Sequence, residues 1–195
     1  MRKSEATNGW HSRGYLPQFD VEQIMQFVTF RLSDSMPQPI LTKWRAELAV
    51  EANIDLDAAL RRRVETYLDQ GYGQCYLRHS AVAQLVQNSL LFFDGERYKL
   101  SAWVVMPNHV HALLTPLVGH QLSQILHSLK SYTVIKANKI LSTGGRFWQP
   151  ESFDRYIRDS KHFASVVRYV ENNPVNARLC AQAQDWPYSS AHFRS

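Results

Sequence analysis

Two histidines one residue apart, His109 and His111, are the side chains of this sequence best placed to do chemistry. They follow the Pro107-Asn108 turn and open an apolar run that is typical of a β-strand. Because side chains alternate between the two faces of a strand, both imidazoles should point to one face while Val110 points into a core. Two imidazoles on one rigid face can hold one metal ion. From the residues alone, the alternative is a pair of polar residues on the solvated side of a sheet.

A second pair, Tyr169 and Asn173, lies four residues apart in a segment with helical spacing. Residues four apart share a helix face, so a phenol and a carboxamide should leave this helix side by side. The same residues also suit a structural role, in which the tyrosine packs and Asn173 caps the helix before Pro174.

The spacing of apolar residues predicts the elements that position these pairs. Alternating β-branched and aromatic runs predict four strands, over residues 26–32, 98–106, 109–115 and 152–158. Helical spacing predicts helices over residues 41–70, 78–93, 121–141 and 161–173. The first of these has a polar break near residues 53–55, which indicates two helices, and Pro174 should end the last. This order predicts an α+β, ferredoxin-like fold: a four-stranded antiparallel sheet with helices packed on one face, and extra helices inserted after the first strand.

Length and composition suit one globular domain, since the chain has 195 residues of which 45% are hydrophobic. We expect residues 1–20 to form an N-terminal arm and residues 21–195 a single domain that includes the insertion over residues 41–70. No apolar segment approaches the roughly 20 residues of a membrane span, so we expect a cytoplasmic protein without a membrane partner. The net charge of +5 favours a polyanionic partner.

Five segments resemble, in this order, the REP-associated tyrosine transposases, relatives of the single-tyrosine transposases of the HUH nuclease superfamily. They are WVVMPNHVHALL, LKSYTVIKAN, RFWQPESFDRYIRD, VVRYVENNPVNA and DWPYSSA. The resemblance implies a metal-dependent nuclease and strand transferase that cuts single-stranded DNA beside hairpins of repetitive extragenic palindromes (REP). It implies a 5′-phosphotyrosine intermediate, and a monomer or a homodimer.

The resemblance also assigns roles to the two pairs. It implies that His109 and His111 bind a divalent metal, Mg or Mn, that Asn173 completes the metal site, and that Tyr169 is the nucleophile. Tyr132 and Tyr156 are rival nucleophiles, but only Tyr169 is followed by a carboxamide four residues later. No dedicated general base is evident in the sequence.

Basic residues are candidates for contacts with DNA phosphates. Those we select are Arg13, Lys130, Lys136, Lys139, Arg146, Arg155 and Arg158. Each is also compatible with a solvated surface charge.

Two other functions stay open at this stage. One is a non-catalytic protein that binds hairpin DNA or RNA on the same sheet, and the other is a relaxase or replication initiator of the same superfamily. The sequence also departs from the usual pattern at Arg178, where the related sequences usually have glycine. Because glycine suits a left-handed backbone, the turn after the last helix is expected to differ.

Overall fold

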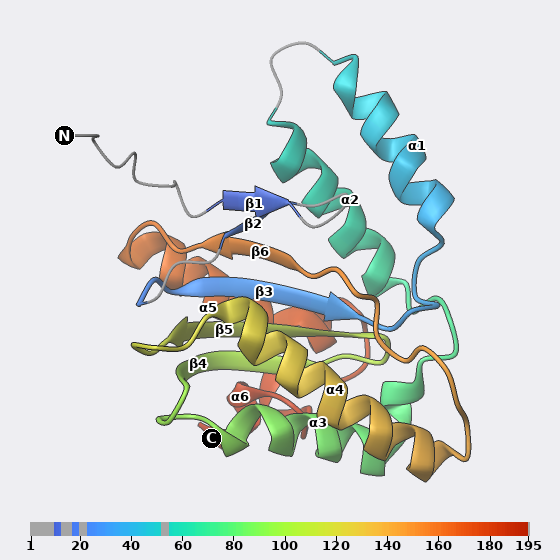
Figure 1. The fold of residues 1–195 in the computed structure, drawn as a ribbon, viewed down its shortest axis with the longest axis vertical. Coiled ribbons are helices and arrows are strands. Elements are labelled where there is room, and N and C mark those ends of the chain that lie inside the picture. The colour runs from blue at the N-terminus through green and yellow to red at the C-terminus, as the bar shows by residue number, and fades with distance from the viewer. Residues whose placement is uncertain (1–9, 13–16, 20–22, 52–54, 195) are drawn as a thin grey trace, which may run out of the picture.

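A four-stranded antiparallel sheet is the centre of the molecule (Figure 1). We describe it from a computed structural model that places residues 10–12, 17–19, 23–51 and 55–194. The strands are β3 (Gln26–Arg31), β4 (Tyr98–Val105), β5 (His109–Pro116) and β6 (Phe153–Tyr156), in the spatial order β4-β5-β3-β6. This confirms the predicted antiparallel α+β sheet.

The strand that carries the histidines is held on both sides, because β5 pairs with β3 and with β4. Three residues, Met106, Pro107 and Asn108, connect β4 to β5, and the Met106 N–H donates to the His109 carbonyl across the turn (2.9 Å). A strand with two partners and a short turn has little freedom to shift its register. The direction of the two imidazoles is therefore fixed by the backbone.

One face of the sheet is covered by two helices, α3 (Ser80–Phe92) and α4 (Leu122–Leu141). Alternate residues of the central strands, such as Val28 and Val110, pack against Val86 and Leu129 of these helices in the largest apolar core. The two helices are the ones expected between the strands of a ferredoxin-like fold. Figure 1 shows α4 in front of the sheet.

The opposite face is covered by α5 (Ser160–Asn176), which Figure 1 shows behind the sheet. The prediction that the helices pack on one face is therefore wrong for this helix. Helix α5 lies on this face because its buried stripe packs there, with Val166 and Val170 against Phe27 and Leu113. Both faces of the sheet are apolar in the centre, so both need a cover.

Pro174 does not end α5, contrary to the prediction, and the helix continues to Asn176. Proline removes one backbone donor, but the Ala177 N–H still donates to the Asn173 carbonyl and the Leu179 N–H to the Pro174 carbonyl. The turn that follows keeps a left-handed residue, Arg178, with φ of +58°. The expected change of that turn is thus not observed, because arginine adopts the conformation that glycine favours.

Two helices lie between β3 and α3, as predicted: α1 (Gln38–Ala49) and α2 (Leu56–Asp69). Their apolar stripes pack on each other and on Phe153 of β6. Helix α1 begins three residues earlier than expected, since Pro39 fits the first turn of a helix. The carboxyl end of α2, and with it Asp69, lies near the start of β5.

The N-terminal segment contributes a small two-stranded sheet of β1 (Trp10–Ser12) and β2 (Pro17–Phe19), with β2 next to β6. Arg13 lies outside the described residues. Three short helices complete the chain: η1 (Tyr76–Arg78), η2 (Ala183–Asp185) and α6 (Ser190–Phe193). Among the described helices, none combines the length and apolar character that a membrane crossing requires.

Candidate active site

The two histidines of β5 face each other beneath α5, with their Nε2 atoms 3.1 Å apart. Both side chains are 0% exposed. The alternation of the strand places them on the same face, while Val110 and Ala112 point into the core on the other. The alternative of two polar residues on a solvated face is therefore wrong.

The Nδ1 atom of each imidazole has a hydrogen-bond partner, which orients the ring. Asn108 uses its Nδ2 to donate to the carbonyls of Leu68 (3.1 Å) and Tyr72 (3.0 Å), so its Oδ1 accepts from His109 Nδ1 (2.7 Å). His111 Nδ1 lies 2.7 Å from the Thr29 hydroxyl, which can accept its proton. Nε2 is then the unprotonated atom of His109, and it is the unprotonated atom of His111 when the Thr29 hydroxyl accepts from Nδ1.

Burial keeps both imidazoles neutral. It lowers the pKa of His109 to about 3. The pKa of His111 is lowered well below its ordinary value, first by burial and then by the neighbouring His109 and Arg155. Two neutral rings whose lone pairs meet at 3.1 Å repel each other unless a cation or a proton lies between them. This donor set fits a metal ion, since metal–nitrogen bonds of about 2.1 Å from one ion can reach both atoms.

Asp69, at the end of α2, is the third member of this cluster. Its Oδ1 lies 3.8 Å from His109 Nε2, and the ligand atoms of Asp69, His109 and His111 all lie within 4.8 Å of one another. Burial raises the pKa of Asp69 to about 6, and a hydrogen bond from Asn173 opposes this rise. Asp69 was not predicted from the sequence, because nothing in the spacing of an amphipathic helix distinguishes this carboxylate from its neighbours.

Asn173 is fully buried next to the carboxylate, with its Nδ2 3.5 Å from Asp69 Oδ1. In this orientation the amide holds Asp69 in place instead of turning an oxygen toward the histidines. Among the described residues, its Oδ1 has no hydrogen-bond partner. A buried amide oxygen without a donor costs about 1–3 kcal/mol, so a ligand that turned the amide over would relieve this cost.

Tyr169 extends from α5 toward the same cluster, with its hydroxyl 3.5 Å from His111 Nε2 of the same chain. Phe27 fixes both rings, because it stacks on His111 with centroids 5.2 Å apart and contacts Tyr169 edge-on at 5.9 Å. Burial raises the pKa of Tyr169, and the carboxylates of Glu65 and Asp69 raise it further. The phenol is therefore protonated and close to the proposed metal ligands.

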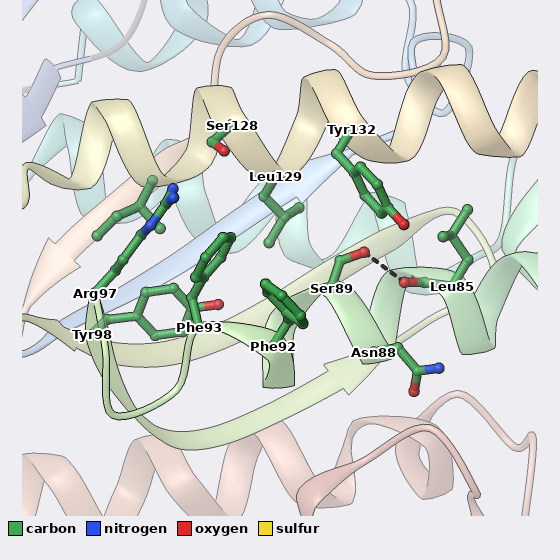
Figure 2. Close-up of a pocket in the computed structure, with 11 residues that line it drawn as sticks. Leu85, Asn88, Ser89, Phe92, Phe93, Arg97, Tyr98, Ser128, Leu129 and Tyr132 are labelled. Atoms are coloured by element: carbon green, nitrogen blue, oxygen red, sulfur yellow. Dashed lines mark hydrogen bonds between the residues drawn. The ribbon is translucent and has the colours of Figure 1, made fainter.

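The rival tyrosines lie elsewhere. Tyr156 follows Arg155 on β6 and points to the other side of the strand, and its side chain is 40% exposed. Tyr132 is on α4, across the sheet from the histidines, and is 51% exposed. It lines a cavity of about 380 Å³ between α3 and α4, together with Phe92 and Phe93 (Figure 2). Of the three tyrosines, Tyr169 alone is near the histidine pair.

Two charged residues of neighbouring elements face Tyr169. Arg155 of β6 places its guanidinium 5.0 Å from the centre of the Phe27 ring. Glu65 of α2 lies close enough to Tyr169 for its charge to raise the pKa of the phenol. Arg155 was a predicted DNA-binding residue, whereas Glu65 was missed for the same reason as Asp69.

The other predicted basic residues divide into two groups. Lys130 is turned inward, where its ammonium donates to the carbonyls of Gln149 and Pro150 and to the Ser152 hydroxyl, at 2.8–3.0 Å. All three of its protons are thereby used, so the prediction of a phosphate contact is wrong for Lys130. Four others are exposed: Lys136, Lys139, Arg146 and Arg158.

Known proteins are similar to this chain in sequence and in fold. Residues 82–173 match the family model described as "Transposase IS200 like". A REP-associated tyrosine transposase of Escherichia coli (strain K12) is 29% identical over 112 residues, which cover 56% of this chain and 64% of that protein. A solved structure of a REP-associated tyrosine transposase bound to a REP hairpin has a TM-score of 0.56 and 20% identity, covering 94% of this chain and 83% of that one.

The resemblance to the REP-associated tyrosine transposases is confirmed. The segment that matches the IS200-like transposase model contains both histidines, Tyr169 and Asn173. Glu65 and Asp69 precede that segment. The match spans just under two thirds of the length of the E. coli transposase, and the likeness to the solved structure establishes the shared fold.

Proposed function

We propose that this protein is a metal-dependent nuclease and strand transferase that acts on single-stranded DNA beside REP-type hairpins, with Tyr169 as its nucleophile. The observation that carries this proposal is the approach of the Tyr169 hydroxyl to within 3.5 Å of His111, whose Nε2 is 3.1 Å from that of His109. The hairpin named for the solved relative supports the choice of substrate.

The metal would be held by His109, His111 and Asp69, with Asn173 as a further ligand if its amide turns over. A carboxylate among the ligands favours Mg or Mn, the metals expected from the sequence, although imidazole also accepts zinc. When bound, the ion would neutralise charge on the non-bridging oxygens of the scissile phosphate.

Tyr169 would attack the phosphorus in line with the departing oxygen. The bond between its Oη and phosphorus forms while the bond to the 3′ oxygen breaks, leaving a 5′-phosphotyrosine and a free 3′-hydroxyl. The phosphotyrosine keeps the energy of the original ester, so a second 3′-hydroxyl can attack it and rejoin strands without ATP. Because the nucleophile and the histidines meet within one chain, a monomer suffices for this step.

Positive side chains around Tyr169 would bind the DNA backbone. Arg155 lies on β6 close to the phenol, and Arg158 follows that strand. Lys136, Lys139 and Arg146 are exposed on or after α4 and would contact more distant phosphates. Arg13 stays a prediction.

The experiment that tests the function is adduct formation on a labelled single strand that carries a REP-type hairpin. The wild-type protein should form a covalent protein–DNA adduct on a denaturing gel with Mg or Mn, and none with EDTA. Tyr169→Phe should abolish the adduct and leave DNA binding intact, whereas Tyr132→Phe and Tyr156→Phe should form it normally. An adduct that survives Tyr169→Phe would place the nucleophile elsewhere, and binding by the wild type without any adduct would indicate a non-catalytic hairpin binder.

A further inference from the structure

Strand β4 lies at an edge of the sheet, because β5 is the only strand among the described residues that pairs with it along its length. Its second half and the residue that follows, over residues 102–106, form the apolar run AWVVM, which has no charge and no proline. Such an edge is a template for another strand, since β-branched and aromatic residues favour extended structure. The edge of β4 therefore needs a cover or a partner.

The stretch DWPYSSA, residues 185–191, covers this edge. The Val105 N–H donates to the Tyr188 carbonyl (2.8 Å), and Val104 forms an antiparallel bridge with Ser189. Because the bridge is isolated, the stretch covers the edge without adding a strand to the sheet. Helix α6, which begins within the stretch, lies beside β4 (Figure 1).

Side chains of the stretch satisfy further backbone groups of β4. The Trp103 N–H donates to the Ser190 hydroxyl (3.2 Å), and Trp186 Nε1 donates to the Val105 carbonyl (3.0 Å). Trp103 and Val105 are alternate residues, whose backbone groups point away from the sheet at an edge. A side chain satisfies such a group without offering a backbone to a further strand, and Pro187 has no N–H to offer. The stretch thus ends the sheet.

Glu171 of α5 anchors the stretch from the other side. Its carboxylate accepts from the Ser190 hydroxyl (2.7 Å) and pairs with Arg194 (2.9 Å). Arg194 also donates to the Ser101 carbonyl of β4. The Trp186 ring packs in the apolar cluster that α5 shares with the sheet. Both β4 and α5 therefore hold the stretch in place.

We propose that residues 185–191 form a cap that keeps the chain a monomer, and that the uncovered edge of β4 pairs with β4 of a second copy of the chain. Two identical edges can pair antiparallel about a twofold axis, so that each copy offers the other the same donors and acceptors. Val104 and Val105 belong to the apolar clusters on opposite faces of the sheet, so the pairing would also bring these clusters of the two copies together. The absence of charge over residues 102–106 removes the repulsion that usually keeps identical edges apart.

The test is a variant that displaces the cap, Ser189→Lys. Ser189 is 0% exposed, and burying an ammonium group is unfavourable, so the stretch should leave β4 while the sheet stays folded. Analytical ultracentrifugation over an about 100-fold range of concentration should show one chain for the wild type and a rise toward two chains for the variant. Ser131→Lys makes the same change at an exposed serine of α4 and should stay a monomer.

Hydrogen exchange identifies the surface that pairs. In the dilute Ser189→Lys variant, the Trp103 and Val105 amides should exchange at least about tenfold faster than in the wild type, because the cap no longer protects them. Their protection should return at high concentration, where the second copy replaces the cap. The double variant Ser190→Ala with Arg194→Ala removes side-chain contacts of the cap without burying a charge. It should show the same changes to a smaller degree, and it serves as the test if Ser189→Lys does not fold.

Four results would overturn the proposal. A wild type that dimerises with its cap in place, or variants whose Trp103 and Val105 amides stay protected when dilute, would show that the stretch is not the cap. Fast exchange of these amides in a variant that stays a monomer at every concentration would show that the edge does not pair. A dimer in which they still exchange fast would place the interface elsewhere. None of these results depends on the Tyr169 adduct, so the cap and the proposed function are tested separately.

Discussion

Asn108 links two parts of the site through one side chain. Its Nδ2 binds two carbonyls at and after the end of α2, and its Oδ1 accepts from His109. The same amide therefore places Asp69 and selects the tautomer of His109. Hydrogen bonds of this kind, one step removed from a metal ligand, typically change metal affinity by about 10- to 100-fold.

At the same scale, Asp69→Asn should weaken Mn²⁺ binding at least about tenfold, because the variant keeps the shape of the side chain and loses its charge. Isothermal titration with Mn²⁺ at pH 7.5 measures the affinity. Asp57→Asn, in the first turn of the same helix, is the matched control and should bind Mn²⁺ as the wild type does. Equal affinity of Asp69→Asn and wild type would remove the carboxylate from the metal site.

At the scale of elements, the local periodicities of the sequence are enough to predict the strands, most helices and both functional pairs. A period of two places His109 with His111, and a spacing of four places Tyr169 with Asn173. Glu65 and Asp69 could not be predicted in this way, because only the contact between α2 and α5 distinguishes them from other charges of α2. The same limit applies to Lys130, whose inward direction depends on residues 149–152.

The stripe of α5 that packs on the sheet should be a main source of the stability of the protein. Val170 is 0% exposed and lies among Phe27, Val104 and Leu113. Val170→Ala should lower the free energy of unfolding by about 2 kcal/mol, measured by urea denaturation. Val118→Ala makes the same chemical change at a side chain that is 70% exposed, and its effect should stay within about 0.5 kcal/mol. Equal losses in the two variants would show that α5 contributes no packing energy.

At the scale of the whole molecule, the sheet separates two environments. One face carries the larger apolar core under α3 and α4, and the other carries the histidines, Phe27 and the stripe of α5. The site lies where β5, α2 and α5 meet, so its geometry depends on tertiary packing as a whole. Lys130 of α4 contributes to that packing by holding the segment before β6.

Global stability should therefore depend on pH through Lys130. Burial is the main cause that lowers the pKa of Lys130 to about 7, Arg31 adds to the effect, and Glu151 opposes it. Between pH 7 and about 10.5, the unfolded chain binds more protons at this lysine than the folded chain does. Its contribution to the free energy of unfolding must then rise with pH, by at most about 1.4 kcal/mol per unit.

Urea denaturation at pH 7, 8 and 9 measures this contribution when the wild type is compared with Lys130→Met. Other titrating groups affect both proteins alike, so the wild-type free energy of unfolding should increase more steeply with pH. Parallel pH dependences would show that the lysine stays fully charged in the folded protein.

Glu65 and Asp69 belong to α2, which is part of the helical insertion between β3 and α3. They lie upstream of the segment that matches the IS200-like model. A chain reduced to residues 82–173 would retain the imidazoles and the phenol but would lose Glu65 and Asp69. Changes confined to α2 can consequently alter the affinity of the site for a cation, while β5 and α5 keep their sequences.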